Sequence, residues 1–393
     1  MRVGINCYLL QAHIGGLKQY FLTLVDELLR SDHSNEYVLF WFEHNTQELA
    51  KLSTDKWKAH AVQLQSQEQV VDHLDRIDLY FCPFSALYPA PLPLPTVMTL
   101  VDIQEIYHPE FFTPADLQAR DRYYRSSTHM ANHVLTISEF SKQTIVKHHS
   151  RPADKISVAY LSANEQFYRA SEIEIAPASP LPDRYIFFPA NFWKHKNHDT
   201  LLRALTLLRE RDGMAPDLVL TGFEQQNGYP MAESIEKYGL SKQVHVLGYV
   251  SIENLAYLYR HAEMLAFPSL FEGFGIPLVE AMAAGCPVIA SRCTSIPEVV
   301  LDAAELFDPE SPEDIARAIK LLWTDQAVRQ RLRSSGFERA KAFSPSSTAQ
   351  THIRAFHRAA QEFSITKYYW DRFVYQYVYV ARFKMRWRNK ITN

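Results

Sequence analysis

Two glutamates eight positions apart, Glu272 and Glu280, stand on either side of a glycine-flanked loop and the start of a predicted helix. Gly273 and Gly275 permit backbone conformations and close approaches that a Cβ atom would forbid. Pro277 suits the first turn of a helix, where its missing N–H group costs nothing. The free N–H groups of such a turn, together with the helix dipole, attract anions. The segment therefore predicts a site for a phosphate-bearing ligand.

Glu280 falls inside a helix that is apolar nearly all round, and such a helix is usually buried. Its apolar members are Ile276, Leu278, Val279, Ala281, Met282, Ala283 and Ala284. A buried carboxylate without partners is costly, whereas the two hydroxyl groups of a ribose could donate hydrogen bonds to it. Glu272, in the loop ahead of the helix, would then face the sugar of a sugar diphosphate. Taken alone, two such glutamates could instead be structural ion-pair partners.

The elements that position these residues alternate along the chain. Short apolar runs predict strands at 3–7, 37–41, 60–64, 79–82, 96–100 and 133–137, and again at 185–188, 218–221, 244–247, 264–267 and 288–290. Apolar residues at helical spacing predict helices at 18–30, 139–148, 201–209, 231–237, 253–259, 276–284 and 314–323. This alternation predicts an α/β protein with two doubly wound parallel sheets, each covered by helices on both faces.

The chain has 393 residues, enough for two domains of about 150–200 residues each. We expect a Rossmann-like domain at 1–170, a proline-rich linker at 171–184 and a second Rossmann-like domain at 185–345. A helical pattern at 347–363 is expected to cross back to the first domain, so that 346–393 holds a crossover helix and a basic aromatic tail. Doubly wound domains bind their ligands outside the carboxyl ends of the strands.

Composition excludes several classes of function. The chain is 47% hydrophobic and 22% charged, as a globular protein is, and its net charge of −3 offers no general attraction for nucleic acid. The scattered cysteines Cys7, Cys82, Cys286 and Cys293 predict reduced thiols in a cytosol and lack metal-ligand spacing. The apolar N-terminal stretch is too short for a signal peptide, and no apolar run is long enough to span a bilayer. We therefore expect a cytoplasmic protein without a metal.

The end of the chain differs from the rest in charge and aromatic content. Residues 364–393 hold seven Lys or Arg and one Asp, so their formal charge is +6. One interpretation is a membrane-surface segment, with its cations facing anionic lipid and its aromatic rings in the interface. The other is that the aromatic residues pack on the first domain and the basic end is solvated.

The segment from Ser269 to Ile289, which contains Glu272-Gly-Phe-Gly-Ile-Pro-Leu-Val-Glu280, resembles the Glu-x7-Glu signature of retaining GT-B glycosyltransferases, especially glycosyltransferase family 4. The resemblance extends over nearly the whole chain. The segment 188–198 resembles the family's phosphate-binding loop, 15–20 its Gly-Gly loop, and 138–142 and 296–300 match other landmarks. It implies the GT-B fold, with the acceptor domain at 1–170 and the nucleotide-sugar donor domain at 185–345. It also implies transfer of a sugar from a nucleotide diphosphate sugar, with retention at the anomeric carbon and no required metal.

The resemblance also implies roles for individual residues. The ammonium of Lys196 would neutralise the charge that develops on the leaving diphosphate, and electrostatic stabilisation of this kind is usually the largest catalytic term. Glu272 and Asp102 complete the predicted catalytic set. Donor binding would use these loop and helix residues: Gly16, Asn191, Lys196, Glu272, Gly273, Phe274, Gly275, Ile276, Leu278 and Glu280. His195 and His198 are expected to hydrogen bond within the loop.

Two positions depart from the family's pattern. Many relatives carry an arginine in the stretch where Ala190 and Asn191 stand, so a second cation is missing here or comes from elsewhere. Relatives commonly have His-Asp where this chain has Val101 and Asp102, and that histidine contacts the donor sugar. A valine side chain cannot form hydrogen bonds. Asp102 could still bind the acceptor or orient its loop, and a structural role is the alternative.

The resemblance implies a hexosyltransferase, and the acceptors usual in the family imply that it acts on a glycan or lipid-linked acceptor in cell-surface polysaccharide biosynthesis. The loop at 193–198 resembles that of mannosyltransferases, which favours GDP-mannose over a UDP-hexose as donor. The nucleotide sugar is the substrate, and no further cofactor and no nucleic-acid partner is expected. Two alternatives stay open: a catalytically silent donor-binding subunit, which Val101 favours, and a nucleotide-sugar epimerase, whose motifs the chain lacks.

Overall fold

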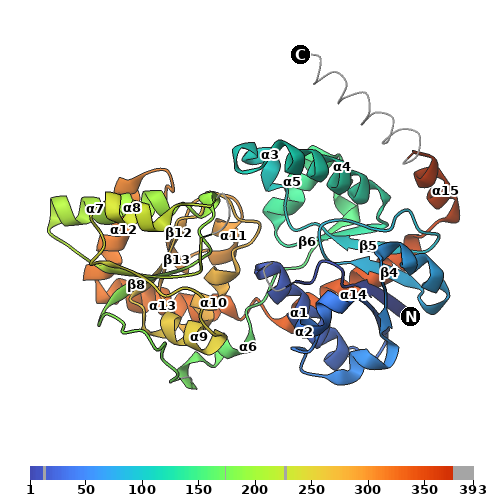
Figure 1. Ribbon diagram of the computed structural model, residues 1–393, viewed down its shortest axis with the longest axis horizontal. Helices are drawn as coiled ribbons and strands as arrows, with labels where there is room; N and C mark the ends of the chain where they lie inside the picture. The colour runs from blue at the N-terminus through green and yellow to red at the C-terminus, as the bar shows by residue number, and fades with distance from the viewer. Residues whose placement is uncertain (12–14, 173, 225–227, 375–393) are drawn as a thin grey trace, which may run out of the picture. The chain divides into compact units, whose positions relative to one another are not determined.

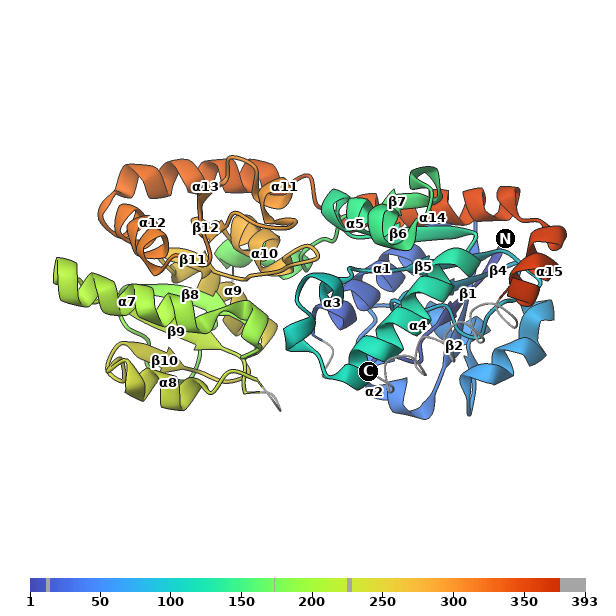
Figure 2. The ribbon, with the colours of Figure 1, turned by 90° about the horizontal axis from the view of Figure 1, so that it is seen from above.

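The computed structural model describes residues 1–11, 15–172, 174–224 and 228–374. The chain divides into two compact α/β units (Figure 1 and Figure 2). Unit 1 comprises Met1–Leu161 together with the chain from Pro345 onward, and unit 2 comprises Ser162–Ser344. The α/β class and the two parallel sheets predicted from the sequence are confirmed.

Unit 1 is built on a parallel sheet with the strand order β3-β2-β1-β4-β5-β6-β7. Its strands are β1 Arg2–Asn6, β2 Glu36–Trp41, β3 Val62–Gln63, β4 Leu79–Cys82, β5 Thr96–Thr99, β6 His133–Thr136 and β7 Ile156–Val158. Its helices are α1 Gly16–Ser31, α2 Thr46–Leu49, α3 Gln104–Tyr107, α4 Pro114–Met130, α5 Glu139–His149, α14 Pro345–Glu362 and α15 Ile365–Val374.

Unit 2 is built on a parallel sheet with the strand order β10-β9-β8-β11-β12-β13. Its strands are β8 Tyr185–Pro189, β9 Asp217–Thr221, β10 Val244–Val246, β11 Met264–Phe267, β12 Val288–Ser291 and β13 Ala304–Phe307. Its helices are α6 Glu165–Tyr168, α7 His198–Asp212, α8 Met231–Lys237, α9 Ile252–His261, α10 Ile276–Ala284, α11 Ile296–Val300, α12 Pro312–Thr324 and α13 Gln326–Ala340. Figure 1 shows α7, α8 and α12 on one face of this sheet and α9, α10 and α13 on the other.

Both sheets have the doubly wound strand order, in which the chain reverses its direction of travel beside the first strand of the sheet. In unit 2 this switch point lies between β8 and β11, which are hydrogen-bonded neighbours. The loops that follow these two strands therefore leave the sheet side by side at its carboxyl edge. Ligands of such sheets bind in the crevice at this point. The loops 190–197 and 268–275 are therefore the candidate ligand-binding loops of unit 2.

Several elements differ from those predicted. In the expected linker, 171–184, residues 174–184 form no helix or strand, and the division between the units falls earlier, between Leu161 and Ser162. The segment ahead of the expected linker groups with unit 2 because α6 packs on α9 and α10. The strand expected at 60–64 is only Val62–Gln63, since a 3₁₀ helix, Asp55–His60, occupies its start.

The helix expected at 347–363 is α14, and it crosses back to unit 1 as predicted, where it packs on α1, β5 and β6. A buried hydrogen-bond chain fixes it there. His352 Nδ1 donates to the carbonyl oxygen of Thr348 (2.8 Å), and its Nε2 accepts from the hydroxyl of Tyr20 (2.7 Å), which lies 2.8 Å from the hydroxyl of Thr99. Burial lowers the pKa of His352 to about 4, so the ring is neutral in this chain of bonds.

Among the described helices, none combines the length and hydropathy that crossing a bilayer requires. The predicted membrane-surface segment at 364–393 is described as far as Val374, where α15 ends. Its remaining part, 375–393, lies outside the described residues.

Candidate active site

The structure brings Lys196 and Glu272 together at the switch point of unit 2. Lys196 ends a 3₁₀ turn in the loop after β8, and Glu272 lies in the loop after β11. The Nζ atom of Lys196 is 2.7 Å from Oε1 of Glu272, and the two side chains are only 18% and 11% exposed. Residues separated by most of a domain in sequence thus form one shielded ion pair at the edge where a doubly wound sheet binds its ligand.

Asn197, directly after Lys196, ties together the loops of three strands. It adopts the left-handed conformation (φ 61°), which Asn tolerates better than most residues. Its Nδ2 donates to the carbonyl oxygens of Pro268 (3.0 Å) and Pro309 (2.8 Å), which follow β11 and β13. Its Oδ1 accepts from the hydroxyl of Thr200 at 2.6 Å. Sequence reasoning missed this role, for which an Asn just before a helix was the only local signal.

Two residues from the loop after β12 hold the loop of Glu272. The N–H group of Glu272 donates to the hydroxyl oxygen of Thr294 (3.2 Å). The buried hydroxyl of Ser295 donates to the carbonyl oxygens of Glu272 (2.9 Å) and Phe274 (3.2 Å). The ring of Phe274 packs edge-to-face on Phe343. Thr294 and Ser295 were not predicted, although they directly precede the family landmark at 296–300.

Helix α10 begins directly after Gly275, whose φ of 93° is a conformation that favours glycine, as predicted. Gly273 was expected to behave in the same way, but it has no positive φ. The N–H group of Leu278 is engaged within the turn, because it donates to the carbonyl oxygen of Gly275 at 2.9 Å. Leu278 is therefore a poor candidate for an anion contact, and Pro277 has no N–H group to offer. The prediction that this turn binds a phosphate therefore rests on the N–H group of Ile276.

Glu280 lies one turn into α10, and this helix is buried as predicted. The hydroxyl of Tyr259, a fully buried residue of α9, donates to Oε2 of Glu280 at 2.8 Å. The carboxylate thus already has a protein donor, which the sequence did not reveal. Burial raises the pKa of Glu280 to about 7, against the opposing effect of the Tyr259 hydrogen bond. Both the protonated and the ionised form are therefore accessible near neutral pH.

The loop between β8 and Lys196 packs closely on the loop after β9. Asn191 accepts a hydrogen bond through Oδ1 from the N–H group of Phe223 (3.4 Å). Gly222 has φ 108°, and a Cβ atom there would stand 2.5 Å from the carbonyl oxygen of Ala190. Glycine is required at such a contact. Asn191 thus has a structural partner in the neighbouring loop, and its contact with a donor stays a prediction.

The expectation that His198 hydrogen bonds within the loop is wrong. Its ring is buried among the rings of Phe188, Phe192 and Tyr229. Neither ring nitrogen has a hydrogen-bond partner within the described residues. Burial, followed by the charge of Lys196, lowers the pKa of His198 to about 3. The imidazole is therefore neutral, and it packs as an aromatic ring against these three neighbouring rings.

Known proteins resemble this chain in sequence and in fold. Residues 171–339 match the family model described as glycosyl transferases group 1. The chain is 30% identical over 264 residues to O-antigen chain mannosyltransferase B of Escherichia coli, a match that covers 66% of this chain and 69% of that protein. The chain belongs to the glycosyl transferases group 1 family.

Further relatives of this group 1 glycosyltransferase include the serotype-specific mannosyltransferase WbdA of Escherichia coli, with 29% identity over 238 residues. That match covers 59% of this chain but 29% of WbdA, so the chain spans less than a third of WbdA's length. Among solved structures, Anabaena Alr3699/HepE in complex with UDP-glucose superimposes with a TM-score of 0.68 at 17% identity, covering 90% of this chain and 98% of that one. This likeness supports the GT-B fold predicted from the sequence.

Two predicted site residues of the glycosyltransferase lie in unit 1. Gly16 begins α1, directly after Gly15, which has φ 50°, and its contact with the donor stays a prediction. Asp102 accepts a hydrogen bond from the N–H group of Gln104 (3.1 Å) at the start of α3. The carbonyl oxygen of Val101 accepts from the hydroxyl of Thr136 at 3.4 Å. Asp102 thus orients its own loop, one of the roles that the sequence left open, and its catalytic role stays a prediction.

Over the described ranges, no three residues of the types His, Cys, Asp and Glu are arranged to hold a metal ion. The four cysteines are free thiols.

The raised pKa of Glu280 leads to a prediction about stability. In the folded chain this pKa is about 7, above the ordinary value of 4.5. The folded state therefore binds the proton more tightly, and unfolding free energy falls as pH rises from about 4.5 to about 7. From pH 5 to pH 8, the unfolding free energy of the wild type should fall by roughly 2–3 kcal/mol more than that of Glu280→Gln, because glutamine cannot titrate. Urea unfolding at several pH values measures this difference.

A matched control is Glu233→Gln, which alters an exposed carboxylate on α8. Its unfolding free energy should follow that of the wild type at every pH. Parallel curves for the wild type and Glu280→Gln would show that Glu280 does not titrate in this range.

Proposed function

We propose that this glycosyltransferase is a retaining, metal-independent mannosyltransferase. Its donor would be a nucleotide diphosphate sugar, GDP-mannose in preference to a UDP-hexose, and its acceptor a growing polysaccharide or a lipid-linked glycan. The observation that carries the proposal is the shielded Lys196–Glu272 pair at the switch point of unit 2. The two Escherichia coli relatives support the sugar and the acceptor class, because one is an O-antigen chain mannosyltransferase and the other a serotype-specific mannosyltransferase.

The chemistry follows from the charges at this edge of the sheet. In a front-face transfer, the bond between the anomeric carbon and the diphosphate oxygen breaks while the acceptor oxygen bonds to the same face. The acceptor proton passes to the departing diphosphate. Lys196 and the N–H group of Ile276 would stabilise the negative charge of that leaving group, and Glu272 would accept hydrogen bonds from sugar hydroxyl groups. Such a mechanism relies on positioning and charge stabilisation.

Glu280 would anchor the ribose of the nucleotide. Its ionised form can accept hydrogen bonds from two ribose hydroxyl groups in addition to the one from Tyr259. Donor binding would then stabilise the ionised carboxylate and lower the pKa of Glu280, which opposes the rise that burial causes. UDP-glucose is the ligand in the HepE complex, so a UDP-hexose remains the second donor to test.

The test is product analysis with the purified chain, GDP-mannose or UDP-glucose, and a lipid-linked or polysaccharide acceptor. NMR of the product reports the anomeric configuration. We expect α-linked mannose from GDP-mannose, at a rate that a chelator does not change. A β-linked product would contradict retention, and loss of activity with the chelator would contradict metal independence.

The second candidate is a catalytically silent donor-binding subunit, which is favoured by Val101 in place of the histidine common in relatives. A ligand that binds only the native state raises the apparent melting temperature. If GDP-mannose raises the melting temperature but no acceptor is glycosylated, this second candidate is the better description. Interconversion of the nucleotide sugar without any acceptor would instead indicate an epimerase.

A further inference from the structure

Helix α15 carries three of its four aromatic residues on an exposed face. Ile365, Tyr369 and Trp370 are 49%, 62% and 63% exposed, and Phe373, whose ring contacts Trp370, is 52% exposed. Positions four and eight residues apart share one face of a helix. A surface helix of a globular protein normally turns its apolar face toward the core. The outward face of α15, defined by these four residues, reverses that arrangement.

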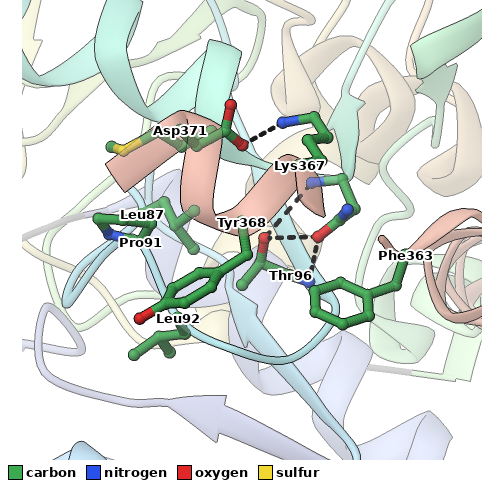
Figure 3. A pocket seen from close by; sticks show the side chains of 10 residues that line it. Leu87, Pro91, Leu92, Thr96, Phe363, Lys367, Tyr368 and Asp371 are labelled. Atoms are coloured by element: carbon green, nitrogen blue, oxygen red, sulfur yellow. Dashed lines mark hydrogen bonds and ion pairs between the residues drawn. The ribbon is translucent and has the colours of Figure 1, made fainter. Parts of the chain in front are cut away.

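The inner face of α15 borders a hollow in unit 1. Figure 3 shows Lys367, Tyr368 and Asp371 on the side that lines a hollow over the segment from Leu87 to Thr96. Lys367 and Asp371 form an ion pair one turn apart along this side. Because Lys367, Tyr368 and Asp371 line this hollow together with residues of the segment from Leu87 to Thr96, the four residues of the outward face lie on the exposed side of the helix.

The charge of the adjoining chain indicates what would cover this face. Arg372 is exposed near the end of α15, and the sequence at 375–393 holds five Lys or Arg and no Asp or Glu. Tyrosine and tryptophan favour the boundary between lipid headgroups and acyl chains, and clustered cations are attracted to anionic lipid. An exposed aromatic face that is followed in the sequence by five cationic residues fits an anionic bilayer surface.

We propose that α15 is a membrane-surface helix, whose outward face enters the interface of a bilayer that contains anionic lipid. The helix lies in the interface and does not cross it. The proposal is independent of the proposed function, because binding to vesicles requires neither donor nor turnover. In a cell it would keep the enzyme at the surface where lipid-linked acceptors are found.

The experiment is vesicle flotation with the full chain. Wild-type protein is mixed with vesicles of phosphatidylcholine alone or of phosphatidylcholine with phosphatidylglycerol. We expect binding to the anionic vesicles and at least about tenfold weaker binding to the neutral ones, with a decrease at high salt. Tyr369→Ser combined with Trp370→Ser should weaken the anionic binding by about tenfold or more, since it removes the interfacial rings.

The matched control is Tyr249→Ser in unit 2, because Tyr249 is 83% exposed and lies far from α15 in sequence. This variant should bind vesicles like the wild type. Equal binding by the wild type and the α15 double variant would overturn the proposal. So would a wild type that binds no vesicles but sediments as a dimer that the double variant does not form, since a second copy would then cover this face.

Discussion

Replacing Lys196 by alanine is expected to lower the turnover number by a factor of about 10² to 10³, the usual effect of removing one preorganised group that stabilises transition-state charge. The Lys196 side chain is only 18% exposed, and its ammonium lies 2.7 Å from a carboxylate oxygen of Glu272. Water cannot easily replace it there. Initial rates at saturating donor and acceptor measure the change in turnover number.

The control for this prediction is Lys194→Ala, which removes an exposed cation from the same 3₁₀ turn. Its turnover number should stay within about twofold of the wild type, as surface substitutions rarely act beyond their own contacts. A similar loss in both variants would show that the loop responds to net charge, and that Lys196 has no specific role.

A double variant separates catalysis from stability at this pair. Lys196→Ala leaves the carboxylate of Glu272 shielded and without its ammonium partner, which is destabilising in itself. Adding Glu272→Gln removes that uncompensated charge and should recover part of the melting temperature. Turnover should not recover, because the leaving group still lacks its cation. Recovery of both would mean that Lys196 acts only by holding the fold.

Replacing Asn197 by alanine is expected to reduce the unfolding free energy by about 3 kcal/mol. The buried carbonyl oxygens of Pro268 and Pro309 would each lose their side-chain donor, and an unsatisfied buried polar group costs about 1–3 kcal/mol. Alanine in the left-handed conformation adds about 1 kcal/mol. Urea unfolding measures the free energy, and donor affinity should fall as well, because Lys196 is the preceding residue.

Asn197→Gly separates the two causes. Glycine adopts the left-handed conformation without strain but cannot donate to either carbonyl. Its unfolding free energy should therefore lie above that of Asn197→Ala, and still well below that of the wild type. A loss smaller than about 1 kcal/mol in Asn197→Ala would contradict a linking role for this side chain.

The segment from Met264 to Ala284 was predicted to the residue, because local rules define it. The apolar strand β11 is followed by Pro268 and by a loop that contains two glycines. Gly275 permits the turn into α10, and Pro277 suits the first turn of that helix. A glycine with positive φ follows its end at Gly285. Each of these signals depends only on neighbours in sequence, so it survives without any tertiary information.

Three of the elements that the sequence did not predict, α4, β7 and β13, have weaker local signals. Helix α4 has few apolar residues at helical spacing, although Thr113 and Asp116 form a capping box at its start. The strands β7 and β13 are short and lie at the edges of their sheets. An edge strand has a partner on one side only and needs no long apolar run, so its sequence resembles that of a loop.

The sequence by itself determined the α/β class, the crossover helix, and the two glutamates and the lysine as the residues to examine. Only the tertiary structure decided their partners: Lys196 with Glu272, Tyr259 with Glu280, and Asn197 with the ends of β11 and β13. The physical reason is that periodicity and capping act within a few residues. Hydrogen bonds and ion pairs between loops depend on which strands become neighbours, and strand order is set by packing over the whole sheet.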